Sequence, residues 1–285
     1  MTRPQHTAQS SPQSVHSKTQ ASDIMVIKVG GRFFNELMEQ SEDKHPLLHA
    51  IDALNLQGKQ IVLVHGGGDQ VQSQLNALGF KSIKANGLRV TPFDHMPIVA
   101  GVLSGYLNKT LVSHSSSIGI SAVGITLADG GIALCNPVSA ELGAVGAPVA
   151  KDPALLKHLL NANMLPIVAS IGADARGNLY NINADHAATC IAQLLNANLF
   201  LLSDVKGVLD AQGNKLDALS SQQAQQMIAA KIITDGMVIK VNAAQDAADI
   251  LNAPVTIGSW NDIDGLTDSR RPFGTQIHPH SDSTS

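Results

Sequence analysis

Two lysines far apart in the chain lie beside glycine-bearing segments. Lys28 lies in the apolar run 24–31, which ends in paired glycines, and Lys240 ends the segment 234–240, which contains Gly236. A third such segment, 65–68, lies between them and carries three consecutive glycines. Lysines beside exposed backbone N–H groups can stabilise a phosphoryl group during its transfer. The pattern therefore predicts a phosphotransferase.

Composition limits the classes of protein to which the chain can belong. Its 285 residues are enough for one large α/β domain or two lobes with a substantial core. A hydrophobic fraction of 44% and a mean hydropathy of +0.07 are typical of a soluble globular protein. Aromatic residues make up only 3%, so the core must be aliphatic, which suits buried parallel strands. The net charge of −4 and the lack of a basic run argue against a nucleic-acid partner.

The remaining composition predicts a cytoplasmic protein with polar ends. Cys135 and Cys190 form neither a CxxC site nor a disulfide framework, so we expect reduced thiols. No HExxH motif occurs, and we expect no metal site made by protein side chains. No apolar stretch approaches the roughly 18 residues of a membrane span. Residues 1–22 and 278–285 are predicted to be disordered polar tails, with a transit peptide as the alternative for residues 1–22.

Short aliphatic runs alternate with segments of helical period along the chain. This alternation predicts an α/β fold with a largely parallel sheet. Residues 131–150 break the alternation and predict a hairpin-rich insertion over one end of the sheet. The predicted strands are 24–29, 61–64, 122–126, 164–169, 199–202 and 255–257, and the predicted helices include 69–78, 152–162, 184–195 and 235–251.

The clearest helix follows Thr91 and spans about residues 93–113. We expect Thr91 to cap it, Pro92 to occupy its first turn and Asp94 to favour its N-terminus. Its apolar side chains form one continuous stripe at positions 99, 102, 103, 106, 107 and 111. The stripe fits a helix that faces the core and equally a helix that joins two copies of the chain.

Paired glycines follow two predicted strands. Gly30 and Gly31 follow the first strand, and residues 66–68 follow the second and open a helix. Glycine lets the backbone approach a ligand closely, and a helix N-terminus favours anions. Both segments end strands of one sheet, where ligands of α/β proteins bind, although tight turns alone would also explain them. No GxxxxGK[ST], GxGxxG, HRD or DFG motif is present, which disfavours P-loop, dinucleotide-binding and protein kinase sites.

The two lysines differ in how strongly their surroundings predict a function. Lys28 lies among apolar residues of a strand, where an ammonium group without a partner is costly, so we expect it to meet an anion at the strand end. Lys240 lies in a predicted helix, and an ordinary surface position remains the alternative. Asp185 could hold both lysines through charge-assisted hydrogen bonds, while an N-cap formed by Asn183 or Asp185 is the alternative for that segment.

Arg89 precedes the 93–113 helix in the segment 86–91. Arginine pairs bidentately with carboxylates, which makes Arg89 a candidate for binding an acidic substrate. An ordinary surface arginine remains the alternative.

Seven segments together resemble the amino acid kinase family, in family order over roughly residues 24–275. Segments 86–91 and 181–185 are most similar to the branch of that family that acts on N-acetyl-L-glutamate. The resemblance implies a three-layer αβα sandwich, with an acceptor-binding and dimerising lobe at 23–195 and an ATP-binding lobe at 196–277. The seven segments are 27–31, 64–68, 86–91, 169–172, 181–185, 202–209 and 233–240.

The resemblance also implies transfer of the γ-phosphoryl group of MgATP to the γ-carboxylate of N-acetyl-L-glutamate, a step of arginine biosynthesis. It implies that Lys28 and Lys240 stabilise the transferred group and that Asp185 orients them. Gly31 and Gly67 would donate backbone N–H groups to it. The implied acceptor-binding residues are Gly67, Gly68, Arg89 and Asn181, and the implied nucleotide-binding residues are Asp204, Val205, Lys206, Gly207, Val208, Leu209, Ile232, Ile233 and Thr234.

Nothing in the chain dictates a protein ligand for Mg²⁺, which the phosphates can hold. Alternatives are a related kinase for N-acetyl-aminoadipate, glutamate or carbamate, a catalytically idle amino-acid sensor and, least favoured, a dehydrogenase. Family members inhibited by arginine are hexameric and carry an extra N-terminal helix, whereas residues 1–22 show no amphipathic period. We therefore expect an arginine-insensitive homodimer joined through residues 93–113.

Overall fold

The computed structural model describes residues 23–39, 45–85, 88–268 and 270–280. Within these residues, eight strands form one sheet in the order β12-β14-β13-β11-β1-β2-β8-β5. All neighbouring strands are parallel except β13 and β14, so the predicted α/β class with a mainly parallel sheet is confirmed. The strands are β1 (Ile24–Val29), β2 (Gln60–His65), β5 (Ala122–Thr126), β8 (Leu165–Ala169), β11 (Asn198–Ser203), β12 (Ala218–Leu219), β13 (Val255–Ser259) and β14 (Thr275–Ile277).

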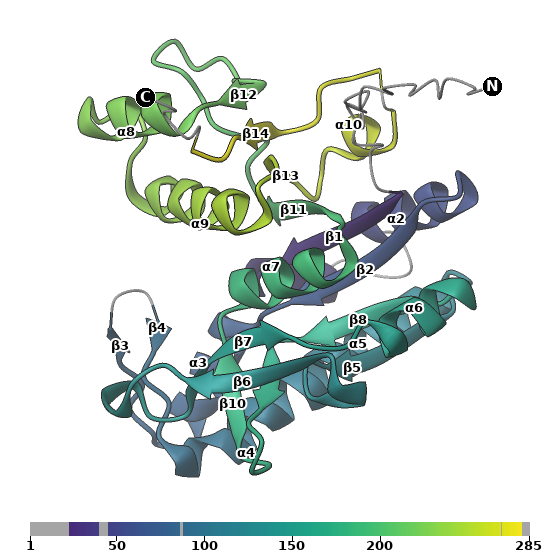
Figure 1. Cartoon of the computed structure of the whole chain (residues 1–285), viewed down its shortest axis with the longest axis vertical. Helices are drawn as coiled ribbons and strands as arrows, with labels where there is room; N and C mark the ends of the chain where they lie inside the picture. Colours follow the sequence, from purple (N-terminus) through teal and green to yellow (C-terminus); the bar gives the residue numbers. More distant parts are fainter. Residues whose placement is uncertain (1–22, 40–44, 86–87, 269, 281–285) are drawn as a thin grey trace, which may run out of the picture.

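Helices pack along the width of this sheet and make it the central layer of an αβα sandwich (Figure 1). The helices α5 and α6 contact β8, α7 contacts β1, and α9 contacts β13. No helix of the described residues is long and apolar enough to cross a membrane. The α-helices are α1 (Gly31–Glu39), α2 (Pro46–Leu56), α3 (Gly68–Ala77), α4 (Met96–Ala100), α5 (Asn108–Ser117), α6 (Ala154–Asn161), α7 (Ala184–Leu195), α8 (Ser221–Ala229), α9 (Asp235–Leu251) and α10 (Ile263–Thr267).

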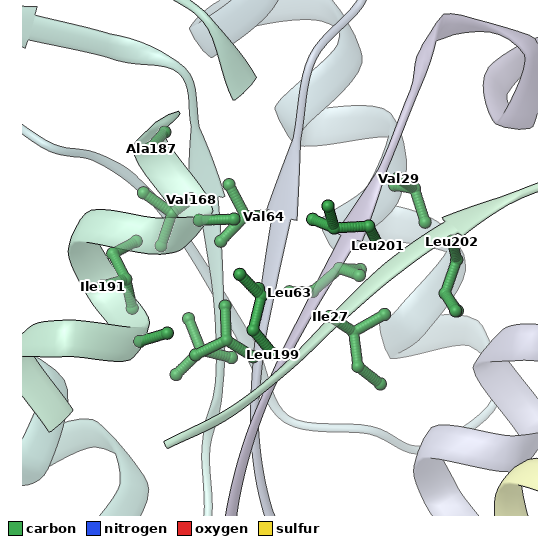
Figure 2. Close-up of a cluster of buried hydrophobic side chains, with 14 of the residues drawn as sticks. Ile27, Val29, Leu63, Val64, Val168, Ala187, Ile191, Leu199, Leu201 and Leu202 are labelled. Atoms are coloured by element: carbon green, nitrogen blue, oxygen red, sulfur yellow. The ribbon is translucent and has the colours of Figure 1, made fainter. Parts of the chain in front are cut away.

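The core that holds the site in place lies between the central strands and α7. Figure 2 shows Val64 of β2 and Val168 of β8 beside Ala187 and Ile191 of α7, while Ile27 and Val29 of β1 lie on the other side of the strands. Ile27 and Leu63 are fully buried, as are both α7 residues. Burial of aliphatic surface of this kind is the main favourable term in folding, so a well-buried core supports the strand ends that border the site.

The predicted insertion forms part of a second sheet. Strands β6 (Ala133–Pro137) and β7 (Val145–Ala150) pair antiparallel, which confirms the hairpin. Strand β10 (Leu179–Ile182) then pairs parallel with β7 and antiparallel with β9 (Ile171–Ala173). The hairpin is therefore built into a four-stranded sheet that leads directly into α7.

The central sheet is continuous across the predicted lobe boundary near residue 196. Strand β11, just after that boundary, pairs with β1 at the start of the chain. Residues 1–22 and 281–285 of the predicted polar tails lie outside the described residues. Residues 278–280 are held against α9, because the N–H and the ring Nδ1 of His280 lie 2.8 and 2.7 Å from the carboxylate oxygens of Asp249. For these three residues the prediction of a disordered tail is wrong.

The helical segment after Pro92 differs from the prediction. It runs as a 3-10 turn η1 (Phe93–His95), α4, a π-helical stretch η2 (Gly101–Leu107) and α5, which ends at Ser117. Thr91 does not cap it, because its hydroxyl donates to the carbonyl of Arg89 instead. The buried stripe residues recur every four positions, which in an α-helix drifts by about 40° per step. The wider π turn offsets that drift and keeps them facing the core.

The apolar stripe was predicted to face either the core or a second copy of the chain, and its residues differ in their burial. Val99, Leu103, Leu107 and Leu111 are buried in the core, whereas Tyr106 is 60% exposed. The core-facing interpretation therefore holds for four of the six apolar positions. The exposed part of the segment leaves the interface interpretation open.

Four helices of the structure, α1, α2, α8 and the short α10, were missing from the sequence-based assignment. Helix α1 starts on a glycine, which is a weak helix former, and α2 starts at Pro46 with His45 as its N-cap. Helix α8 has little apolar content but carries a complete capping box between Ser220 and Gln223. Capping marks the starts of α2 and α8, whereas α1 buries a short apolar face of Phe33, Phe34 and Leu37.

Candidate active site

Two helix N-termini meet at the carboxyl end of the central strands. Val29 of β1 and His65 of β2 are register partners, so the glycine segments that follow them lie at the same edge of the sheet. Helix α1 starts at Gly31, and α3 starts at Gly68 with Gly67 as its N-cap. Unpaired N–H groups of helix starts are suited to binding anions. This edge of the sheet is therefore a candidate anion site.

Gly67 could not be replaced without disturbing the site. A Cβ atom at this position would overlap the side chains of Leu107 and Leu103 in the η2 segment. The close approach of these helices therefore requires glycine here. This requirement is independent of any ligand.

Lys28 meets an anion where the strand ends. Its ammonium Nζ lies 2.8 Å from Oδ1 of Asp185, and the lysine side chain is only 16% exposed. Asp185 occupies the first turn of α7, where the helix dipole favours a carboxylate. Asn183 is the N-cap and accepts from the Asp185 N–H at 2.8 Å, so the capping interpretation also holds for this segment.

Lys240 pairs with a different carboxylate. Its Nζ lies 3.4 Å from Oδ1 of Asp204, whose Oδ2 accepts a 2.7 Å hydrogen bond from Arg32. The prediction that Asp185 holds both lysines is therefore wrong in this structure. Lys240 projects from α9, and the carboxylate within its reach is the one that follows β11. Partial burial raises the pKa of Asp204, but the bond from Arg32 and the charge of Lys240 outweigh it and leave that pKa below its usual range.

One cavity nevertheless contains both lysines. It has a volume of about 460 Å³, and both ion pairs described above line it. A second cavity of about 280 Å³ shares Lys28, Gly31 and Asp185 with it. The second cavity also contains the predicted acceptor-binding residues Gly67, Gly68, Arg89 and Asn181. The predicted catalytic and acceptor-binding residues thus border two adjoining cavities.

The guanidinium of Arg89 is held by neutral hydrogen-bond acceptors. It donates to the carbonyl of Gly68 at 2.7 Å and to Oε1 of Gln72 at 2.6 Å, and it also contacts the hydroxyl of Ser82. Burial lowers the pKa of Arg89, and the charge of Asp69 acts in the opposite direction. Within the described residues, no carboxylate forms an ion pair with Arg89. Neutral acceptors thus hold the side chain in place while its charge remains available to an anionic ligand.

Asn181 lines the 280 Å³ cavity together with Arg89. Its Nδ2 donates to the hydroxyl of Thr91 at 3.1 Å, which ties β10 to the segment that carries Arg89. Asn86 and Gly87 of that segment lie outside the described residues. The side-chain carbonyl oxygen of Asn181 forms no hydrogen bond with the described residues and is free to meet a donor on a ligand.

The remaining predicted residues line a separate, more apolar cavity of about 400 Å³. Its lining comprises 205–209, 232–234 and Met237, which includes every predicted nucleotide-binding residue except Asp204. Gly207 has a φ of 152°, and its Cβ would press on the hydroxyl of Thr275, which accepts from the Val208 N–H at 2.9 Å. The loop after β11 is therefore fixed by a specific contact to β14.

Some cavity residues were not predicted from the sequence. Arg32, Asp69, Lys84 and Trp260 all line the 460 Å³ cavity. Arg32 directly follows the second glycine of its segment, a position that could have suggested it. Trp260 lies far along the chain and donates a 2.7 Å hydrogen bond from Nε1 to Glu36 of α1, a contact that no local pattern shows.

The carboxylates of the cavity fit a Mg²⁺ ion that arrives with a nucleotide. Asp185 and Asp204 are already paired with cations, and no group of three or more possible metal ligands occurs among the described residues. Mg²⁺ typically takes one or two carboxylates and completes its shell with phosphate oxygens and water. Among the described residues that line the 460 Å³ cavity, the carboxylates that could contact such an ion are Asp69, Asp185 and Asp204.

Comparisons with known proteins show the family to which the chain is similar. Residues 23–259 match the amino acid kinase family. The chain is 44% identical over 256 residues to the acetylglutamate kinase of Photorhabdus laumondii, covering 89% of this chain and 98% of that protein. It is 46% identical over 243 residues to that of Serratia proteamaculans, covering 85% and 93%.

Solved structures support the fold. The smu.665 protein of Streptococcus mutans superposes with a TM-score of 0.73 at 31% identity, covering 90% of this chain and 98% of that one. The N-acetylglutamate synthase of Neisseria gonorrhoeae gives a TM-score of 0.75 at 22% identity, covering 90% of this chain and 60% of that one. At this lower identity the second likeness concerns the fold alone.

Proposed function

The chain belongs to the amino acid kinase family, and we propose that it phosphorylates N-acetyl-L-glutamate. The γ-phosphoryl group of MgATP is transferred to the γ-carboxylate, and the product is N-acetyl-L-glutamyl 5-phosphate, an intermediate of arginine biosynthesis. The curated relatives with 42–46% identity over most of the chain are acetylglutamate kinases. The observation that carries the proposal is the convergence of Lys28, Lys240 and two glycine helix starts on one pair of adjoining cavities.

The chemistry requires charge stabilisation rather than a base. A γ-carboxylate has an unperturbed pKa of about 4.3, so it is ionised at pH 7 and is already a nucleophile. Its negative charge must approach the negative phosphates, and cations and oriented N–H groups lower that repulsion. Lys28 and Lys240 supply the positive charge, and Gly31 and Gly67 supply N–H donors. Asp185 acts as the residue that orients Lys28.

The acceptor occupies the 280 Å³ cavity. Arg89 binds the α-carboxylate of N-acetyl-L-glutamate, and Asn181 and Gly68 contact the rest of the molecule. The support is that the charge of Arg89 is unpaired while its side chain is held by Gly68 and Gln72. In this pose the γ-carboxylate points from the acceptor cavity toward Lys28, which both cavities share.

The nucleotide extends from the other side. Its base and ribose occupy the 400 Å³ cavity lined by 205–209 and 232–234, and its phosphates reach the lysines past Asp204. Mg²⁺ enters as part of the MgATP substrate and offsets part of the phosphate charge. Residues 23–195 thus form the acceptor-binding and dimerising lobe, and residues 196–277 form the nucleotide-binding lobe.

The enzyme works as a cytoplasmic homodimer that arginine does not inhibit. The dimer forms through residues 93–113, where Phe93 and Tyr106 are 57% and 60% exposed. Exposed aromatic side chains are enriched at protein interfaces. Sedimentation of the purified protein tests this: a dimer agrees with the proposal, while a hexamer, or inhibition by arginine below about 1 mM, contradicts it.

A product trap tests the function. The protein is incubated with MgATP and hydroxylamine together with N-acetyl-L-glutamate, L-glutamate, N-acetyl-aminoadipate or carbamate. Acyl phosphates react with hydroxylamine to hydroxamates, and we expect the highest rate with N-acetyl-L-glutamate. One methylene is worth only about 1–3 kcal/mol of discrimination, so the homologous N-acetyl-aminoadipate is the most demanding control. Absence of hydroxamate from N-acetyl-L-glutamate would overturn the proposal.

A further inference from the structure

A buried chain of hydrogen bonds lies beneath the glycine segment that follows β2. His65 ends β2 and Asn108 begins α5, and neither is exposed to solvent. The His65 Nε2 lies 3.2 Å from the Asn108 Nδ2, and its Nδ1 lies 2.8 Å from the carbonyl oxygen of Gly66. The ring thus connects the interior of the protein to the backbone of the candidate anion site.

The donors and acceptors in this chain have one consistent direction. The Gly66 oxygen can only accept, so Nδ1 of His65 must carry the proton, and Nε2 accepts from Asn108. The Asn108 amide is oriented independently: its Nδ2 donates to the carbonyl of Ile167 at 2.9 Å, and its Oδ1 accepts from Lys109 at 3.1 Å. Burial lowers the pKa of His65 to about 4, so the ring is neutral at pH 7.

The ring therefore controls the orientation of one peptide unit. The Gly66 carbonyl and the Gly67 N–H belong to the same planar trans peptide, in which they point in opposite directions. The Gly66 N–H donates to Val29 at 3.1 Å and the Gly67 carbonyl accepts from Val71 at 2.9 Å, so the neighbouring units are fixed as well. The Gly67 N–H itself has no acceptor within the described residues, and Gly67 lines the 280 Å³ cavity. Among the hydrogen bonds of the described residues, the one from His65 is the only one made to this peptide unit, and the glycines on both sides allow the backbone wide conformational freedom.

We propose that His65, kept in its Nδ1-protonated form by Asn108, is a positioning residue that aims the Gly67 N–H at the transferred phosphoryl group. This inference rests on the proposed function, because it gives the Gly67 N–H a negatively charged ligand. Without the bond from His65, the peptide unit rotates and presents a carbonyl oxygen to that ligand, which repels it.

Two substitutions of His65 form a matched pair. His65→Asn places an amide nitrogen near the position of Nδ1 and keeps a donor for Gly66. His65→Gln places its amide near the position of Nε2 and leaves the Gly66 carbonyl without a donor. Removing one oriented donor from a charge-stabilising site lowers kcat by about 10²–10³-fold. We expect His65→Gln to lose kcat on this scale, His65→Asn to stay within about tenfold of wild type, and both KM values to change by less than about threefold.

Melting temperatures of both variants separate this role from a purely structural one. If the two variants lose similar stability but differ in kcat as stated, the positioning role holds. Equal kcat values in two folded variants would overturn it. If either variant fails to fold, Asn108→Ala is measured in its place. This substitution removes the donor that fixes the tautomer of the His65 ring, but it keeps the Gly66 carbonyl and the His65 side chain. It is then expected to lower kcat about tenfold with unchanged KM values, and an unchanged kcat would overturn the inference.

Imidazole ¹⁵N spectra of the ligand-free wild type give a readout that does not depend on activity. The His65 signals, assigned by their loss in a folded His65 variant, should show a neutral ring protonated on Nδ1 between pH 6 and 8. A ring protonated on Nε2 would overturn the inference even if the enzyme is active. A wild type that forms no acyl phosphate would overturn the proposed function and, with it, the role of His65. Normal turnover with the wrong tautomer would overturn only the inference.

Discussion

The proposed acceptor side and the proposed nucleotide side of the site hold their cations in different ways. Lys28 is 16% exposed and lies 2.8 Å from Asp185, which is itself fixed in the first turn of α7. Lys240 is 34% exposed and lies 3.4 Å from Asp204, which it shares with the 70% exposed Arg32. On the acceptor side, one lysine shielded from solvent pairs with one carboxylate. On the nucleotide side, two more exposed cations share one carboxylate.

This difference indicates which parts of the site are organised before ligands bind. Donors fixed in a shielded site stabilise charge strongly, because they need no reorganisation during the reaction. Exposed pairs contribute little by themselves and are screened by salt. We infer that the acceptor side is preorganised, whereas the triphosphate draws Arg32 and Lys240 into place on the nucleotide side.

The largest expected effect comes from Lys28. Lys28→Met removes the shielded positive charge and leaves Asp185 without its partner, so kcat should fall by about 10³-fold with the variant still folded. Steady-state kinetics and a melting curve measure both quantities. Lys59→Met is the matched control, since Lys59 forms an exposed pair with Asp23 away from the cavities, and it should keep wild-type kcat. A Lys28→Met enzyme with more than a tenth of wild-type kcat would contradict the inference that the acceptor side is preorganised.

The next effect is a loss of stability in acid. The folded state lowers the pKa of His65 from 6.5 to about 4 through burial, so the unfolded chain binds the proton first as the pH falls. Above pH 6.5 the neutral ring makes its full contribution to the free energy of unfolding, and this contribution is lost as the pH falls toward 4. The difference between the two pKa values corresponds to about 3 kcal/mol at most. Urea unfolding at several pH values measures it.

The same measurement on His65→Asn provides the control for the acid effect. Asparagine does not titrate, so the slope of unfolding free energy against pH between 6.5 and 4 should be shallower in this variant. Burial also lowers the pKa of His45 to about 4. His45 therefore contributes to the slope of the free energy of unfolding against pH in both proteins. Identical slopes would show that His65 is not a buried neutral group.

Lys240 should matter less than Lys28. Lys240→Met removes a charge from the more exposed ion pair on the nucleotide side. We expect kcat to fall by about 10²-fold, with a rise in KM for ATP. Kinetics at varied ATP concentration separate the two parameters. A loss equal to or greater than that of Lys28→Met would reverse the proposed order of the two sides.

The smallest effect is expected at Arg32. Arg32→Ala removes an exposed partner of Asp204, and KM for ATP should rise about threefold while kcat stays nearly constant. Because exposed charges are screened, the difference from wild type should shrink when the ionic strength is raised. A large loss of kcat that is insensitive to salt would show that Arg32 is organised as firmly as Lys28.

The sequence predicted the elements that carry the site better than the contacts between them. The bounds predicted for β1, β5 and α7 agree with the structure, because aliphatic runs and an alanine-rich helix give strong local signals. The ion pair of Lys28 was foreseeable for the same reason, since a lysine among buried residues needs a partner.

Contacts between distant segments could not be predicted in this way. The pairing of Lys240 with Asp204 depends on how α9 packs beside the end of β11, and no local pattern encodes that distance. The His65 and Asn108 pair joins residues 43 positions apart, and its importance follows only from the direction of its hydrogen bonds. The π-helical stretch likewise reflects packing of the stripe on the core rather than any local propensity.

The central claim is that the acceptor atom is a γ-carboxylate oxygen of N-acetyl-L-glutamate. The most direct measurement uses this substrate labelled with ¹³C at the γ-carboxyl carbon, incubated with MgATP and followed by ¹³C and ³¹P NMR. We predict a new carbonyl signal split by phosphorus, which grows as ADP forms in equal amount and which Lys28→Met fails to produce. Formation of ADP without a phosphorus-coupled ¹³C signal, or coupling at any other carbon, would contradict the account.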